Sequence, residues 1–152
     1  MIRRTMIASA LAAALALPGM ALAQQANFGT AAEARAMLDK AVAALRADKA
    51  KAIESFNAGT NGFRDRDLYP FTANVSDGVF TAHPTLRGKP VRDLKDSTGR
   101  AFGEDILRAG STEGTVNEVS YSFPRPGGGD PAPKVTYVTK VGDQICGVGY
   151  YK

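Results

Sequence analysis

The stretch DLYPFTANVSDGVFTAHP, residues 67–84, constrains the fold most because it defines two strands and the tight turn between them. Its side chains alternate from Leu68 to Ala73, which is typical of a strand. Ser76-Asp77-Gly78 supplies the turn, and its glycine has access to positive φ. A return strand follows from Val79. Pro70 has no N–H to donate, so we expect an edge or irregular position for it.

Two helices are predicted before this hairpin. Thr30-Ala31-Ala32-Glu33 is a capping box, in which the hydroxyl and the carboxylate each satisfy a backbone N–H. Apolar residues then recur at helical spacing as far as Ala47. Asp48 can cap a second helix, which we expect to end at Gly59.

One short helix and three strands are predicted after the hairpin. Residues 85–100 form a polar loop, and residues 101–109 form a short helix that stops at Gly110. The strands are expected at 116–123, 134–141 and 144–151, with 124–133 as a flexible hairpin loop. The pattern predicts an α+β domain with one antiparallel five-stranded sheet, helices on one face and the crossover helix over the other. A sheet face covered by loops is where a small-molecule cavity would form.

The first 23 residues have the organisation of an export signal. Arg3 and Arg4 precede an Ala/Leu-rich run, and Ala21-Leu22-Ala23 is a cleavage site of the A-x-A type. The two arginines leave the general secretion and twin-arginine routes both open. We therefore expect a signal peptide over 1–23 and a periplasmic or secreted domain over 24–152. The alternative is an uncleaved segment that tethers the domain to the membrane.

Charge and residue inventory narrow the class of function. Removing Arg3 and Arg4 from the 19 basic residues leaves 17 against 15 acidic ones, which is not the profile of a nucleic-acid-binding protein. Cys146 is the only cysteine and His83 the only histidine, so neither an internal disulfide nor a zinc cluster is predicted. The chain has no G-x-S-x-G elbow and no Walker loop. We expect no enzyme activity, no cofactor and no metal.

Together these residues resemble a single Cache domain of the second type. The positions that carry the resemblance are Tyr69-x-Phe71, Asp77-Gly78, His83-Pro84, Gly88, Asp93-Leu94, Gly99, Pro124-x-Pro126 and Pro133-x-x-x-Tyr137. The resemblance implies a PAS-like sheet with a long N-terminal helix and extracytoplasmic sensing of small ligands, often short organic acids. In that family the domain usually lies between two membrane helices of a chemoreceptor or histidine kinase. Because this sequence stops right after the last strand, we expect a standalone form that acts through a separate signalling or transport partner.

The residues predicted to bind the ligand combine aromatic walls with a few polar groups. They are Tyr69, Phe71, His83, Tyr121, Phe123, Lys134 and Tyr137. His83 can donate a hydrogen bond to an anion, and Lys134 can neutralise a carboxylate. In a regular strand Lys134 and Tyr137 fall on opposite faces, so both reach one cavity only if Lys134 lies at an irregular strand start. Ordinary core packing or solvent exposure is the alternative for each residue.

Three further charged residues are candidates for a site. Arg125, between two prolines, could hold a carboxylate with two hydrogen bonds. Asp65 and Asp67, two residues apart, could form an acid/base pair or a cation site, although no other residues complete such a motif. A second hypothesis for the whole chain is a protein–protein interaction module of the cell envelope with no small-molecule ligand. Its contact surfaces would be the loops 85–100 and 124–133.

Overall fold

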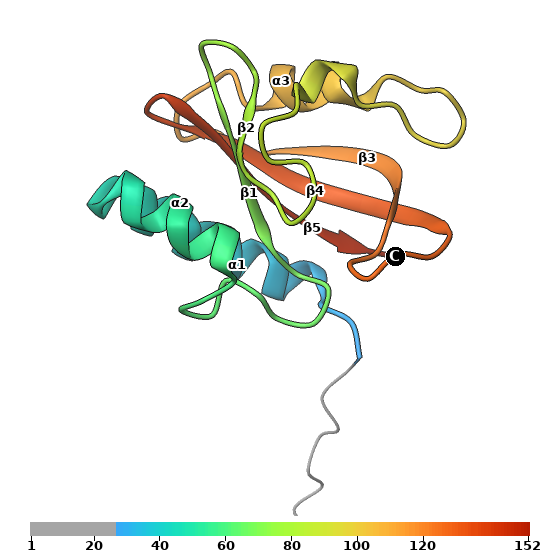
Figure 1. Cartoon of the computed structure of the whole chain (residues 1–152), viewed down its shortest axis with the longest axis horizontal. Coiled ribbons are helices and arrows are strands. Elements are labelled where there is room, and N and C mark those ends of the chain that lie inside the picture. The colour runs from blue at the N-terminus through green and yellow to red at the C-terminus, as the bar shows by residue number, and fades with distance from the viewer. Residues whose placement is uncertain (1–26) are drawn as a thin grey trace, which may run out of the picture.

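The computed structural model of the chain describes residues 27–152 (Figure 1). The signal peptide predicted over Met1 to Ala23 lies outside the described residues. Within residues 27–152, no helix combines the length and the apolar character that crossing a membrane requires.

Two helices open the described chain, and both begin at the predicted caps. Helix α1 (Ala31–Ala47) starts with the full capping box: the Thr30 hydroxyl accepts from the Glu33 N–H at 3.2 Å, and the Glu33 carboxylate accepts from the Thr30 N–H at 2.8 Å. Helix α2 (Lys49–Ala58) starts at Asp48, whose carboxylate accepts from the Lys51 N–H. It ends at Gly59 in the left-handed region (φ 68°), where a side chain would be strained.

Five antiparallel strands form a single sheet, as predicted. In chain order they are β1 (Pro70–Asn74), β2 (Phe80–Ala82), β3 (Asn117–Pro124), β4 (Pro131–Val141) and β5 (Gln144–Tyr151). Their order across the sheet is β2-β1-β5-β4-β3. The last strand is therefore central, between β1 and β4, and β2 and β3 form the edges.

The two faces of this sheet are covered differently (Figure 1). Helices α1 and α2 lie on one face, where Leu38 and Phe56 pack against Cys146 and Val148. The short helix η1 (Val91–Asp93), helix α3 (Phe102–Ala109) and their loops cover the other face. Period-two alternation assigns each strand residue to one face or the other. We call the second face the loop-covered face.

Pro70 occupies an irregular position, as predicted. Strand β1 lies between β2 and β5, but Pro70 is its first residue and pairs only with Val148 of β5, so its missing N–H is tolerated. The predicted bounds of one loop were wrong. The β3–β4 loop is shorter than 124–133, because pairing continues to Pro124 and Pro131. The pairing of β4 with β5 ends at Lys134 and Tyr151. Residues 131–133 lie beyond this pair, so their two prolines interrupt no hydrogen bonds between β4 and β5.

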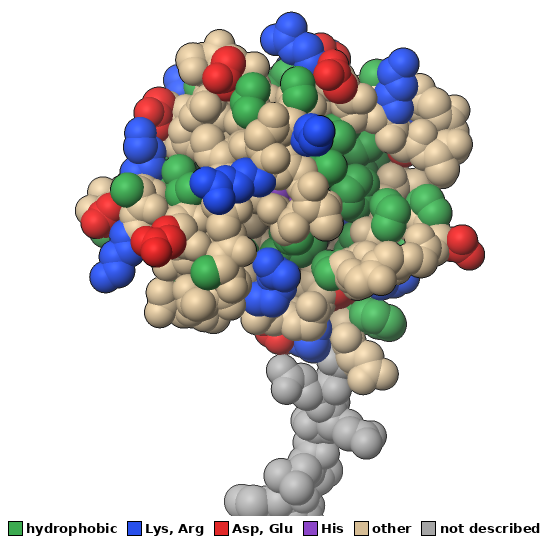
Figure 2. Space-filling view, in the orientation of Figure 1, with side chains coloured by type: hydrophobic (Ala, Val, Ile, Leu, Met, Phe, Trp, Pro, Cys, Tyr) green, Lys and Arg blue, Asp and Glu red, His purple; other side chains and the backbone are tan. Residues whose placement is uncertain are grey.

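Cys146 is buried in the sheet, and the charged side chains are distributed over the surface. The thiol is fully buried, and burial raises its pKa to about 12, so it behaves as a small apolar group. Figure 2 shows Lys and Arg side chains spread over the visible face with Asp and Glu among them, not gathered into a basic stripe.

Candidate ligand-binding site

The loop-covered face encloses a small aromatic cavity. Alternation places Phe71 of β1, Tyr121 and Phe123 of β3 and Lys134 of β4 on this face, and Tyr69 precedes β1. The cavity is closed by Phe80 of β2 and by residues of the segments that follow it: His83, Leu86, Leu94, Phe102 and Ile106. Six of the seven predicted residues therefore come together here. Their role in binding stays a prediction.

The cavity itself is almost filled by these side chains. Its volume is about 10 Å³, which is close to the minimum that one water molecule needs. Phe102 stacks on Tyr121 with ring centroids 4.1 Å apart, and Phe71 meets Phe80 edge to face. An organic molecule therefore requires a movement of side chains or of the covering loops before it can enter.

Lys134 is the unusual member of the cavity because its ammonium group is buried. The residue is 3% exposed. Its Nζ donates a hydrogen bond to the Tyr69 hydroxyl at 3.0 Å. It also lies 4.6 to 5.3 Å from the ring centroids of Tyr69, Tyr151 and Phe123. These rings present their faces to the cation, which favours its charged form.

No carboxylate of residues 27–152 forms a salt bridge with Lys134. Burial lowers the pKa of Lys134 to about 7, and the negative charge of Asp67 opposes this shift only in part. A buried cation without an anion is destabilising, and buried charges are ordinarily paired. The cavity thus contains one positive group that an anionic ligand could neutralise.

His83 lies beside this ammonium group and is neutral. Its Nδ1 accepts the backbone N–H groups of Thr85 and Leu86, both at 3.1 Å, which leaves the ring hydrogen on Nε2. Burial, with the positive charges of Lys134 and Arg64, lowers the pKa of His83 to about 3. The ring also packs against Tyr69 and Phe80. His83 is therefore a fixed hydrogen-bond donor at neutral pH, not a charged group.

The tyrosines on the loop-covered face differ in what their hydroxyl groups can do. Tyr69 accepts from Lys134, and burial raises the pKa of its hydroxyl, so it keeps its own hydrogen for donation. The Tyr121 hydroxyl is 2.8 Å from Thr136 Oγ1 and is already engaged. Tyr121 is therefore a wall of the cavity, and Tyr69 is one of its polar groups.

Tyr137 does not reach this cavity. It lies on the helix-covered face with Tyr150, whose ring centroid is 5.9 Å from its own. The strand is regular at this point, so Lys134 and Tyr137, three residues apart, point to opposite faces. The placement of Lys134 in the cavity excludes Tyr137 from it.

The paired-carboxylate hypothesis does not fit the geometry. Asp65 is held by Arg66 at 3.0 Å, whereas Asp67 accepts the Gly29 N–H at 2.7 Å and faces Arg125 at 3.8 Å. The two carboxylates therefore have separate partners. Among residues 27–152, no group of three or more His, Cys, Asp or Glu is arranged to hold a metal ion.

Sequence reasoning missed two glycines that shape the cavity. Gly147 and Gly149 lie on the loop-covered face of β5. A methyl group on Gly147 would clash with the Phe71 ring, and one on Gly149 would clash with the Lys134 side chain. The repeat G-V-G within a strand was the available signal, because strand glycines often mark a close approach of another group.

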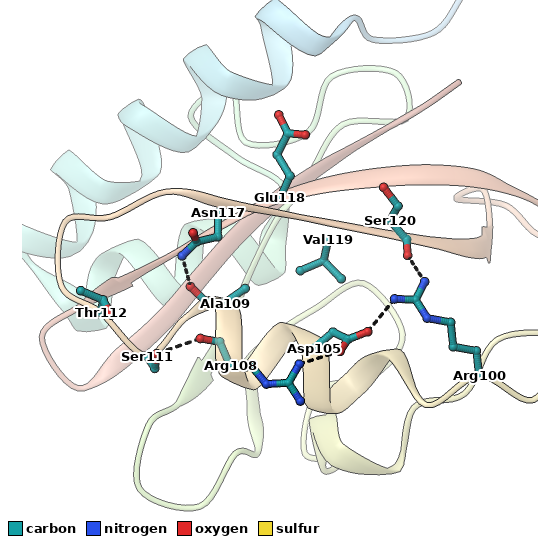
Figure 3. Close-up of a pocket in the computed structure, with 10 residues that line it drawn as sticks. All are labelled: Arg100, Asp105, Arg108, Ala109, Ser111, Thr112, Asn117, Glu118, Val119 and Ser120. Atoms are coloured by element: carbon teal, nitrogen blue, oxygen red, sulfur yellow. Dashed lines mark hydrogen bonds and ion pairs between the residues drawn. The ribbon is translucent and has the colours of Figure 1, made fainter.

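A larger hollow lies between α3 and β3 (Figure 3). It measures about 410 Å³, and several of its polar groups are bound to one another. Asp105 pairs with both Arg100 and Arg108, and the Asn117 amide donates to the Ala109 carbonyl. Asp105 neutralises only one of the two arginine charges, but both guanidinium groups are largely exposed to solvent and already hydrogen-bonded. The aromatic cavity, with its buried ammonium group, is the better candidate site.

The described chain thus combines a five-stranded antiparallel sheet with a long N-terminal helix on one face and a small aromatic cavity on the other. Residues 17–150 match the family described as Single Cache domain 2, and the chain belongs to this family. It is thus a sensor domain of the Cache type, with the PAS-like fold that the sequence predicted.

Solved structures of chemotaxis sensors share this fold. One is a methyl-accepting chemotaxis protein from Vibrio parahaemolyticus RIMD 2210633, with 27% identity, 79% of this chain and 86% of that chain covered, and a TM-score of 0.62. The periplasmic sensor domain of a chemotaxis protein has 22% identity, coverages of 78% and 87%, and a TM-score of 0.59. A Cache chemosensory domain that recognises carboxylic acids has 22% identity, coverages of 78% and 85%, and a TM-score of 0.57. No curated protein sequence matches this chain.

Proposed function

We propose that this domain binds a small organic carboxylate in the aromatic cavity and that Lys134 is its counter-ion. The observation that carries the proposal is the buried ammonium group, which has an aromatic surround and no carboxylate partner in the described chain. His83 Nε2–H and the Tyr69 hydroxyl are the hydrogen-bond donors beside it. Phe71, Tyr121 and Phe123 are the apolar walls. The similarity to a carboxylic-acid-recognising Cache domain supports this class of ligand.

The described form is the closed one under this proposal. A cavity of about 10 Å³ has no room for acetate. Binding therefore couples to the opening of the segment that carries His83, Leu86 and Leu94, and this coupling is the conformational change that a sensor needs. We place the domain in the periplasm, after removal of residues 1–23. A membrane receptor or kinase would be the partner that responds to the bound state.

A thermal-shift screen tests this function directly. The purified chain is heated with small carboxylates, amino acids and amines, each at millimolar concentration. A carboxylate present at 100 times its dissociation constant stabilises the fold by about 2.7 kcal/mol, which raises the melting temperature of a domain of this size by about 10 °C. We expect carboxylates to give the shift and amines to give none. A shift with amines alone would refute the role of Lys134.

The closed cavity also favours a second function, a protein–protein interaction module that kept the fold and lost its ligand. Nearly complete filling by Phe80, Phe102 and Tyr121 is the observation that supports it. The two functions differ in one testable respect: an interaction module gains nothing from the unpaired Lys134. Silence across the whole carboxylate panel, together with co-purification of an envelope protein, would favour this second function.

A further inference from the structure

A second cavity adjoins the aromatic one on its outer side. It measures about 160 Å³ and lies between the segment at Pro84-Thr85 and the β3–β4 loop. Tyr69, His83 and Phe123 line both cavities and so form the wall between them. The outer cavity has space for a carboxylate of a few heavy atoms, whereas the inner cavity holds no more than about one water molecule.

Arg125 lies in the wall of the outer cavity, on the β3–β4 loop. Its guanidinium carbon is 4.5 Å from the ring centroid of Phe28 and 4.8 Å from that of Tyr151, so two rings hold the side chain in place. The side chain is nevertheless 31% exposed. Its position is therefore fixed while part of the group stays accessible.

Arg125 is only loosely paired with Asp67. The Nε to Oδ2 distance is 3.8 Å, which is too long for a hydrogen bond. Both atoms are buried, and neither has a hydrogen-bond partner in the described chain. Asp67 is 5% exposed and uses only its other oxygen, on the Gly29 N–H. A buried carboxylate and a guanidinium that face each other without a hydrogen bond are both incompletely satisfied.

We propose that Arg125 forms an outer carboxylate site, where the ligand binds first before it passes His83 to reach Lys134. This proposal rests on the proposed function, since it concerns the same ligand. In the absence of ligand, Asp67 supplies the negative charge that faces Arg125. An incoming carboxylate competes with Asp67 and makes the short, charge-assisted hydrogen bonds that Asp67 does not make.

Two-step binding has a kinetic signature that stopped-flow mixing with acetate can measure. The chain has five tyrosines and no tryptophan, and Tyr69, Tyr121 and Tyr151 lie at the two cavities, so tyrosine fluorescence is the signal. Rapid binding at Arg125 followed by slower opening predicts an observed rate constant that saturates as the acetate concentration rises. The half-saturation concentration reports the outer site, and the plateau reports the opening step.

Substitutions at Arg125 and Asp67, with one control, test the outer site. Arg125→Gln is expected to raise the half-saturation concentration at least about tenfold, the effect of losing a charge-assisted hydrogen bond, with an unchanged plateau. Asp67→Asn is expected to lower it several-fold because the competing charge is gone. The matched control is Arg35→Gln, which removes an exposed arginine of α1 far from both cavities and leaves both constants unchanged. Arg125→Lys keeps the positive charge but not the two parallel N–H donors of the guanidinium group, so its half-saturation concentration should be intermediate. It replaces Arg125→Gln if that variant does not fold.

The results also distinguish this proposal from the function on which it rests. Observed rate constants that rise linearly with acetate, and that Arg125→Gln leaves unchanged, would overturn the outer site. If calorimetry still detected acetate binding that depends on Lys134, the proposed function would stand. If acetate gave neither heat nor a thermal shift, both proposals would fall together.

Discussion

Replacing Lys134 by methionine tests both expected consequences of the buried ammonium group: a lower stability of the fold and the ability to bind a carboxylate. Methionine has a similar length and no charge, so it fills the same space beside Tyr69 and Phe123. The variant is expected to be more stable than the wild type near neutral pH and unable to bind a carboxylate. The two results together would show that Lys134 lowers the stability of the fold and is needed for ligand binding.

The magnitude follows from the protonation of Lys134. Its pKa falls from 10.5 to about 7 on folding. Between these two pKa values the unfolded chain binds more protons than the folded chain, so the free energy of unfolding rises with pH. The destabilisation caused by burying the Lys134 charge is therefore complete below pH 7 and is lost as the pH rises toward 10.5. At pH 7 this destabilisation is about 4 kcal/mol at 1.36 kcal/mol per pKa unit. Losing the hydrogen bond to buried Tyr69 costs about 1–3 kcal/mol in the variant, which leaves a net gain of about 1–3 kcal/mol.

Urea unfolding at several pH values measures this gain. The stability difference between Lys134→Met and the wild type should shrink by about 2 kcal/mol between about pH 7 and pH 9. Lys89→Met, on an exposed loop, is the matched control and should show no such pH dependence. A Lys134→Met protein that is less stable than the wild type at pH 7, or that binds acetate as tightly, would refute the reasoning.

Three other substitutions or conditions give equally direct tests. Carboxylate binding requires the charged ammonium of Lys134, whose pKa is about 7. The affinity measured by calorimetry should therefore fall about tenfold per pH unit above neutrality and stay level just below it. An affinity that rises with pH would contradict this. The pKa of His83 falls from 6.5 to about 3 on folding. The stability of the wild type relative to His83→Gln should therefore decrease as the pH drops from 6.5 to about 3. If the stabilities of the two proteins changed with pH in parallel, the buried ring would not be neutral. The methyl group of Gly149→Ala would clash with the Lys134 side chain and displace it, which should weaken acetate binding at least about tenfold. Gly99→Ala is the control for the added methyl group, because Gly99 lies in a loop with open space around it. Equal acetate affinities of the two variants would contradict the packing argument.

The fold could be predicted because its local signals agree with each other. The capping box at Thr30, the turn at Gly78 and the alternation of Val119, Tyr121 and Phe123 each specify one structure, and together they leave few arrangements of the sheet. The β3–β4 loop is shorter than predicted because its prolines, which are typical of loops, lie within paired strands. Whether a proline interrupts a sheet depends on which strand lies beside it, and the sequence pattern does not contain that information.

The site could be predicted only in outline, because its chemistry depends on burial. Lys134 follows the run P-A-P, which resembles a loop, and nothing local indicates that its ammonium group is enclosed. The enclosure comes from Tyr69, Phe123 and Tyr151, which belong to three separate segments, and from the missing side chain of Gly149. The low volume of the inner cavity likewise depends on how these rings pack together.

The central claim is that a ligand carboxylate pairs with the buried Lys134, and a crystal structure of the chain grown with acetate or another carboxylate from the screen tests it most directly. The account predicts an enlarged inner cavity with a carboxylate oxygen within hydrogen-bond distance of Lys134 Nζ and His83 Nε2. A carboxylate bound elsewhere, with the aromatic cavity still closed around Lys134, would contradict it.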